Sequence, residues 1–178
     1  MATVRGMTAL RILVPLLLVA TLAGCSTETG GGGLRLTDTK ASVQLLRNEA
    51  WFRLPDVMVK GDSETTDTSM PCDDAGLQRS WLSSTTALIN NSFAPRTAGV
   101  ARDLVASFST QGWEASEATS AGTTEYTLEK VDSFAVISVV ATEKADGHRA
   151  TIAISISGPC VATGGEDSDE VRRLEGRS

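Results

Sequence analysis

A helical pattern followed by four strand-like runs constrains the fold of this chain more than any other feature. From about Pro95 to Gln111, apolar residues recur at helical spacing in one continuous stripe, and Gly112 stands where a left-handed helix terminator is expected. Four runs with strand-like composition follow, at residues 113–118, 124–131, 134–142 and 150–157. An Asp-Gly pair in residues 144–147 predicts a hairpin turn between the last two. This order predicts an α+β fold, an antiparallel meander sheet with one main helix packed on one face.

The last run indicates how the sheet is covered. Ile152, Ile154 and Ile156 alternate with small or polar residues, so one face of the sheet is predicted to be buried and the other wet. The wet face carries Thr151, Ser155 and Ser157, among others.

The first half of the chain predicts a second helix and one more strand. Residues 39–54 show apolar positions at three- and four-residue spacing, Thr37 or Asp38 can cap the start, and Pro55 ends the helix. Residues 60–71 are almost wholly polar and are predicted to form an exposed loop. Residues 79–89 are predicted to form a strand that ends at Asn90.

Composition and charge limit the class of protein. The 178 residues are 41% hydrophobic and 21% charged, which is typical of one globular domain, here placed at residues 39–162. The 16 basic and 22 acidic residues give a net charge of −6, so nucleic acid is not expected as a partner. Residues 163–178 are charged and lack an apolar period, and are predicted to be a disordered tail.

Residues 1–24 have the pattern of a secretory signal. Two arginines precede an apolar run from Ile12 to Leu22, and eleven residues are fewer than the ~20 that span a bilayer as a helix. Loss of this segment changes the net charge from −6 to −8, which would not favour adsorption to an anionic membrane. Residues 25–38, which include four consecutive glycines, are predicted to be a flexible tether.

The signal ends in Leu22-Ala23-Gly24-Cys25, which resembles the bacterial lipobox. That resemblance implies a diacylglycerol on the Cys25 thiol and an anchor at the extracytoplasmic face of the cell membrane. The alternative is an ordinary signal peptide followed by a chance cysteine. The chain also resembles small actinobacterial lipoproteins of unassigned activity, through Cys72, Gly112-Trp113 and the terminal Ser157-Gly158-Pro159-Cys160 in addition to the lipobox. This resemblance implies a cellular location and a fold but no catalytic residue.

Cys72 and Cys160 are expected to form a disulfide. If Cys25 carries lipid, these two remain in an oxidising compartment, where an even number of cysteines usually pairs. The alternative, reactive thiols or metal ligands, lacks a partnering histidine or a Cys-x-x-Cys spacing.

The remaining candidate site residues favour ordinary structural roles. His148, the only histidine, lies beside the predicted hairpin turn and is expected to be solvated. Three acidic groups lack the spacing of a calcium loop and are expected to be solvated charges, with Asp73-Asp74 shaping a turn: Asp62/Glu64/Asp67, Asp73-Asp74 and Glu166/Asp167/Asp169/Glu170. Adjacent helical residues point ~100° apart, so Trp51 and Phe52 cannot both face one core, and an aromatic groove there stays an alternative.

The function expected from these features is non-enzymatic binding at the cell envelope. The partners expected are the membrane, through the lipid on Cys25, and an envelope protein or ligand that the sequence does not identify. A carrier of a small apolar ligand or lipid between helix and sheet is the alternative, and an envelope hydrolase is the least supported, since no Gly-x-Ser-x-Gly motif is present. No cofactor and no metal are expected.

Overall fold

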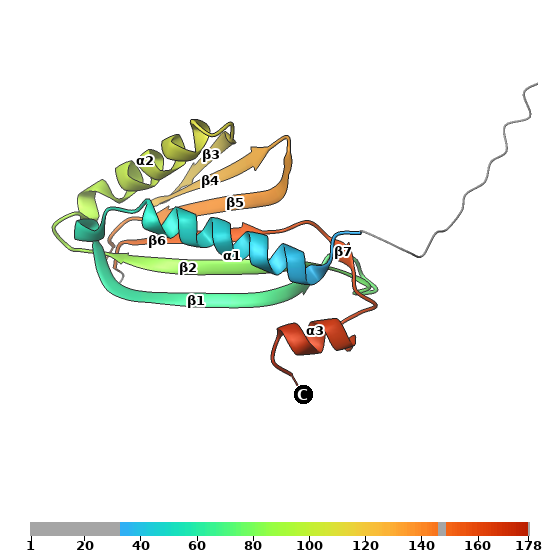
Figure 1. The fold of residues 1–178 in the computed structure, drawn as a ribbon. Helices are drawn as coiled ribbons and strands as arrows, with labels where there is room; N and C mark the ends of the chain where they lie inside the picture. The colour runs from blue at the N-terminus through green and yellow to red at the C-terminus, as the bar shows by residue number, and fades with distance from the viewer. Residues whose placement is uncertain (1–32, 146–148, 178) are drawn as a thin grey trace, which may run out of the picture. The chain divides into compact units, whose positions relative to one another are not determined.

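The computed structural model describes residues 33–145 and 149–177, which form one compact unit. A seven-stranded antiparallel sheet has the order β1-β2-β6-β5-β4-β3, and the short β7 pairs with β2. Helices α1 and α2 lie on the same side of this sheet (Figure 1). The elements in chain order are α1 (Leu36–Phe52), η1 (Asp56–Met58), β1 (Val59–Pro71), β2 (Gln78–Ile89), η2 (Ala94–Arg96), α2 (Thr97–Ser109), β3 (Glu114–Ser120), β4 (Thr123–Lys130), β5 (Ser133–Thr142), β6 (Thr151–Ser157), β7 (Val161–Ala162) and α3 (Asp169–Leu174). The α+β prediction is confirmed.

Helix α2 follows its sequence pattern closely. Pro95 lies in the 3-10 turn that leads into the helix, and Gly112 adopts a φ of +85°, the left-handed conformation that glycine takes without a Cβ clash. The predicted apolar stripe is buried along its whole length: Val100, Ala101, Leu104, Val105 and Phe108.

Helix α1 begins earlier than the sequence pattern predicts. It starts at Leu36, inside the predicted tether, and Leu36 is fully buried. Arg35 is the N-cap residue, and the Asp38 carboxylate accepts a hydrogen bond of 3.2 Å from its backbone N–H, so neither Thr37 nor Asp38 is the cap. Burial of Leu36 in the common core extends the helix beyond its local signals. Residues 25–32 of the predicted tether lie outside the described residues.

Four of the five predicted strands form the meander side of the sheet, and the fifth, β2, pairs with β6. Strands β5 and β6 are antiparallel neighbours, with Thr142 opposite Thr151, as the predicted hairpin requires. Residues 146–148 of the connecting turn lie outside the described residues.

The prediction of a loop at residues 60–71 is wrong. This segment belongs to β1, which pairs antiparallel with β2 along most of its length. Its side chains are polar on both faces, so no alternation of apolar and polar residues marks it as a strand. The strand forms because β2 supplies the backbone hydrogen-bond partners, and its threonines suit extended backbone.

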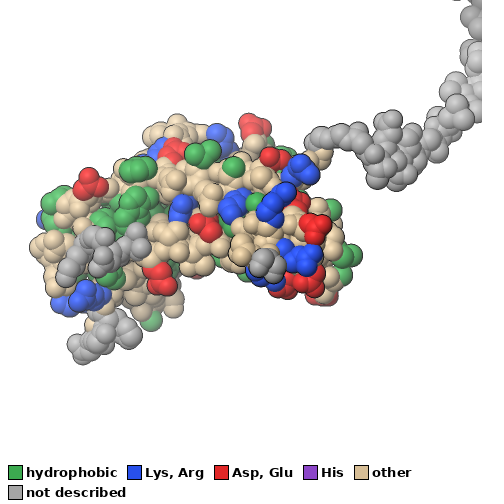
Figure 2. Space-filling view, turned by 60° about the horizontal axis from the view of Figure 1, so that its bottom comes forward, with side chains coloured by type: hydrophobic (Ala, Val, Ile, Leu, Met, Phe, Trp, Pro, Cys, Tyr) green, Lys and Arg blue, Asp and Glu red, His purple; other side chains and the backbone are tan. Residues whose placement is uncertain are grey.

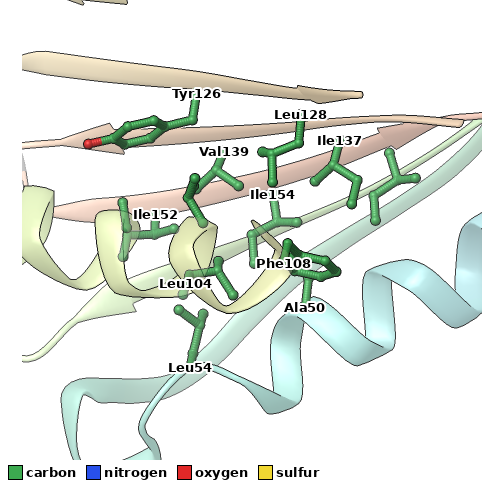
Figure 3. Packing of buried hydrophobic residues seen from close by; sticks show 14 of the residues in the cluster. Ala50, Leu54, Leu104, Phe108, Tyr126, Leu128, Ile137, Val139, Ile152 and Ile154 are labelled. Atoms are coloured by element: carbon green, nitrogen blue, oxygen red, sulfur yellow. The ribbon is translucent and has the colours of Figure 1, made fainter. Parts of the chain in front are cut away.

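The core lies between the sheet and the two helices. Isoleucines and valines of β5 and β6 face Leu104 and Phe108 of α2 and Ala50 of α1 (Figure 3). Phe108 and Trp113 pack edge to face, with ring centroids 6.1 Å apart. Ile152, Ile154 and Ile156 are fully buried, which confirms the face predicted to be covered.

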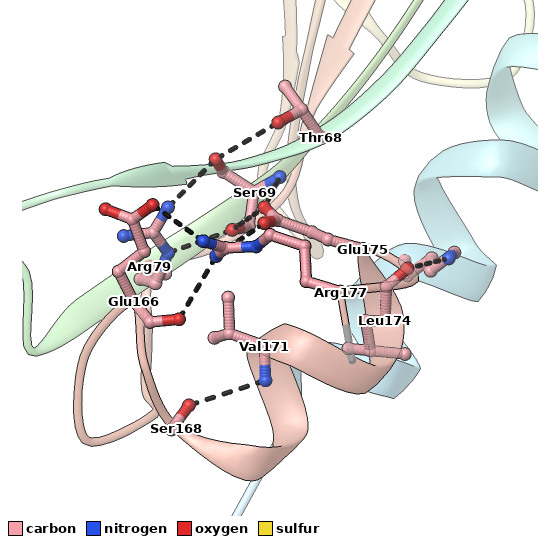
Figure 4. A network of polar contacts seen from close by, with 10 residues as sticks. Thr68, Ser69, Arg79, Glu166, Ser168, Val171, Leu174, Glu175 and Arg177 are labelled. Atoms are coloured by element: carbon pink, nitrogen blue, oxygen red, sulfur yellow. Dashed lines mark hydrogen bonds and ion pairs between the residues drawn. The ribbon is translucent and has the colours of Figure 1, made fainter.

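The C-terminal segment is ordered, contrary to the predicted disordered tail and to a domain ending at residue 162. Ser168 caps α3 by accepting a hydrogen bond from the Val171 backbone N–H, and Val171 is fully buried. After the helix, the Glu175 carboxylate accepts hydrogen bonds from the backbone N–H and the hydroxyl of Ser69 and pairs with Arg177 (Figure 4). The sequence pattern missed this segment because one buried valine and a polar network produce no apolar period.

Figure 2 shows basic and acidic side chains intermingled over one end of the molecule.

The predicted disulfide is confirmed. Cys72 and Cys160 are bonded at an S–S distance of 2.10 Å, with Cα atoms 6.1 Å apart and a sequence separation of 88. The bond ties the turn after β1 to the segment that joins β6 and β7.

Candidate functional site

The sheet leaves one broad face without a helix in the described part of the chain. Because α1 and α2 cover the same side, the alternate residues of β2, β4, β5 and β6 point away from the core. We call this uncovered side the outer face. Apart from Ser80 near the start of β2, its residues are half-buried or exposed, since only their neighbours in the sheet shield them.

One row of hydroxyl side chains crosses the outer face from edge to edge. The strand register places one serine or threonine of each of six strands side by side, and we call this set the hydroxyl row: Ser116, Thr127, Ser138, Ser155, Ser84 and Thr66. Neighbouring strands lie about 4.8 Å apart, so the row extends over roughly 24 Å. A parallel row on four strands is also hydroxyl-bearing: Ser120, Thr123, Thr142 and Thr151.

Acidic side chains flank the hydroxyl row. Glu125 and Glu129 of β4, Glu114 of β3 and Glu64 of β1 occupy outer-face positions next to it. The Ser138 hydroxyl donates to Glu125 at 3.5 Å. Hydroxyls both donate and accept, and small side chains let a partner surface approach closely. The outer face is therefore suited to a flat polar contact with a partner that brings positive charge.

A second candidate site lies on the helix side, where α1 crosses β1 and β2. A recess of about 290 Å³ is lined by Arg47, Asn48, Trp51, Thr65 and Thr85, and we call it the α1 recess. Positions 47, 48 and 51 share one face of the helix, and Thr65 and Thr85 are opposite each other in the strand register. The structure thus answers the question about the aromatic pair: Trp51 lines the recess, while Phe52 is 83% exposed.

Charge in the α1 recess is balanced between Arg47 and Asp67. Their closest nitrogen and oxygen atoms are 3.8 Å apart, too far for a hydrogen bond. Burial raises the pKa of Asp67, but its polar neighbours Ser83, Trp81 and Gln44 and the Arg47 charge outweigh this effect, so the pKa lies below its ordinary value. The Trp81 indole N–H donates a hydrogen bond of 3.4 Å to the Asp67 carboxylate. Asp67 is therefore a carboxylate at neutral pH.

Several acidic residues expected to be solvated also have hydrogen-bond or ion-pair partners, and the side chain of Glu166 stays 63% exposed. Glu170 accepts hydrogen bonds from the backbone N–H and the hydroxyl of Thr37, and Glu166 pairs with Arg177. Asp73 shapes the turn after β1, as expected, because its carbonyl accepts from Gly76 and its carboxylate from the Gln78 backbone N–H. Within residues 33–145 and 149–177, no three acidic, histidine or cysteine side chains are grouped to hold a metal ion.

The other predicted site residues lie outside the described part or serve the fold. Cys25 and His148 are outside the described residues, and Cys72 and Cys160 form the disulfide. None of the described helices is long and apolar enough to span a bilayer. Sequence reasoning missed the recess residues Arg47, Asn48, Thr65 and Thr85. The polar residues at helical spacing within 44–51 could have indicated a polar helix face at this position.

No protein-family model, no curated protein and no solved structure matches this chain. The fold and the two surfaces are therefore the basis for any functional conclusion.

Proposed function

We propose that this protein is a lipid-anchored, non-enzymatic binding module at the extracytoplasmic face of the cell membrane. The proposed location is supported by the signal-like segment 1–24 and by the Leu-Ala-Gly-Cys sequence at 22–25. The outer face is the docking surface, and the hydroxyl row is the observation that supports this assignment.

The partner proposed is a macromolecule with a flat surface and basic side chains. The hydroxyl row offers both donors and acceptors over roughly 24 Å, a width suited to a protein surface. The four flanking glutamates complement positive charge and disfavour a second copy of this chain, which would bring the same glutamates to the contact. This protein would thus present an acidic, hydroxyl-lined sheet to its partner from the membrane.

The anchor is tested by Cys25→Ala. Without the thiol no diacylglycerol can be attached, and the mature charge of −8 supplies no second attraction to an anionic bilayer. The variant should move from the membrane fraction to the soluble fraction once cleavage of the signal segment is verified by mass spectrometry. A cleaved variant that stays with membranes at high salt contradicts the lipid anchor.

The docking surface is tested by cross-linking in the native host. A photoreactive amino acid at Ser155, in the centre of the hydroxyl row, should capture a protein partner. The same group at Leu45, which is 70% exposed on α1, is the control and should not capture that partner. Ser84→Arg should abolish the Ser155 cross-link, because a bulky cation stands in the middle of the row and opposes a basic partner. Equal capture from Ser155 and Leu45 refutes the assignment.

Among the described residues, a groove on the helix side is a candidate site for the carrier alternative. This groove of about 200 Å³ lies between α1 and the turn before β5, lined by Leu34, Val43, Leu46 and Phe134 among others. This volume is below the range of about 300–1,000 Å³ that small-molecule sites usually have. Native mass spectrometry that finds a copurifying lipid on the protein would favour the carrier over the binding module.

A further inference from the structure

The helix side of the sheet is apolar over one half and polar over the other. Strands β5 and β6 present isoleucine, valine and alanine to the helices. Strand β2 presents Trp81, Ala87 and Ile89 on the same side, but around them β1 and β2 also present polar residues to α1: Thr65, Asp67, Ser83 and Thr85. A contact between helix and sheet that includes polar residues buries less apolar surface than a wholly apolar contact. Its polar groups stabilise the fold only where they are hydrogen-bonded.

Arg47, at the centre of the polar half, is not satisfied in this way. Its side chain is 13% exposed, its only ion pair is the 3.8 Å contact with Asp67, and its Nε has no hydrogen-bond partner among the described residues. A largely buried guanidinium has five N–H donors to satisfy, and leaving them unpaired is costly. The Nε atom itself is enclosed, but Arg47 also lines the α1 recess, so a molecule bound there can accept hydrogen bonds from its guanidinium group.

The lining of the α1 recess indicates the chemistry of that molecule. Trp51 contributes an aromatic wall, Arg47 and Asn48 contribute donors, and Thr65 and Thr85 contribute hydroxyls. The Arg47 charge is matched by the Asp67 carboxylate, so the recess has no excess charge to attract an anion or a cation. A ligand with an apolar ring face and several hydroxyls that both donate and accept meets all these groups.

We propose that the α1 recess binds one neutral sugar ring, as a single residue of a longer glycan. The volume of about 290 Å³ is just below the range of about 300–1,000 Å³ for small-molecule sites, so it allows one ring rather than a chain of rings. The recess opens to solvent, so the rest of a glycan can continue outside. This site is separate from the outer face, on the opposite side of the sheet, and does not depend on the lipid anchor.

The proposal is tested by ligand-observed NMR on the full-length protein in a detergent without sugar groups. The probes are neutral oligosaccharides of glucose, mannose, galactose and arabinose, with inorganic phosphate and glucuronate as charged comparators. At least one neutral oligosaccharide should bind saturably with a Kd in the millimolar range, which is ordinary for a ligand of so few atoms. Binding of phosphate or glucuronate alone, or of no probe, overturns the proposal.

Paired variants locate the binding. Trp51→Leu should weaken it about tenfold by removing the ring wall, and Thr85→Val by a smaller factor by removing one hydroxyl at constant volume. Phe52→Leu, at the exposed neighbouring position, is the matched control and should bind like the parent. Thermal unfolding checks that each variant is folded, and Thr85→Val keeps the test valid if Trp51→Leu does not fold. Equal loss in Phe52→Leu, or no loss in either recess variant, refutes the site.

Discussion

Deleting residues 164–178 should destabilise the domain, because α3 completes its core. Val171 is fully buried, and burial of a valine stabilises a fold by roughly 1.5–3 kcal/mol. The Glu175 carboxylate accepts two hydrogen bonds from Ser69, and hydrogen bonds to a charged group contribute about 1.5–3 kcal/mol. Ordering the segment offsets part of this, which leaves a net loss of about 3 kcal/mol. For a domain of this size, that corresponds to a fall in Tm of roughly 10 °C.

The assay is thermal unfolding followed by circular dichroism, with single variants to divide the effect. Val171→Ala and Glu175→Gln should each lower the Tm by several degrees. Asp169→Asn is the matched control, since its side chain is 99% exposed and its pair with Arg172 is a surface ion pair. If the truncated chain unfolds within about 2 °C of the full chain, α3 does not contribute to the stability of the core.

Three further outcomes follow from the same structure. Reduction of the Cys72–Cys160 bond should lower the free energy of unfolding by up to about 4–5 kcal/mol, since it closes 88 residues; an unchanged urea midpoint in reductant contradicts this. Gly158→Ala should destabilise by about 1–3 kcal/mol, because a Cβ there would lie 2.1 Å from the Thr39 Cγ2 atom, and Thr39→Ser should restore part of the loss in the same denaturation assay. Burial raises the pKa of Glu175, but the hydrogen bonds from Ser69 and the nearby Arg177 and Arg79 charges lower it by more. The pKa of Glu175 therefore lies below its ordinary value of 4.5. Its contribution should be complete above about pH 4.5 and lost as the pH falls through the lowered pKa, and Glu175→Gln should flatten stability against pH in that window.

Local sequence signals were enough to predict a helix or strand wherever that element buries an apolar stripe of its own. The five apolar positions of α2 and the three isoleucines of β6 repeat at the periods of a helix and a strand, and the structure buries all of them. The role of Gly112 as a left-handed helix terminator could also be predicted, because it requires only a position directly after the helix and the tolerance of glycine for positive φ. The disulfide followed from cysteine count and from the secreted address that the N-terminal segment predicts.

Tertiary structure decided the elements whose partners are distant in sequence. Strand β1 exists because β2 lies beside it, α3 because Val171 finds a place in the core and Glu175 meets Ser69, 106 positions away. Both surfaces proposed for binding are of this kind. Six hydroxyls form one row only through the register of six strands, and Arg47 and Thr85 meet only where α1 crosses the sheet. A periodicity reports which way a side chain points, whereas its neighbours are set by packing between segments that the linear sequence keeps apart.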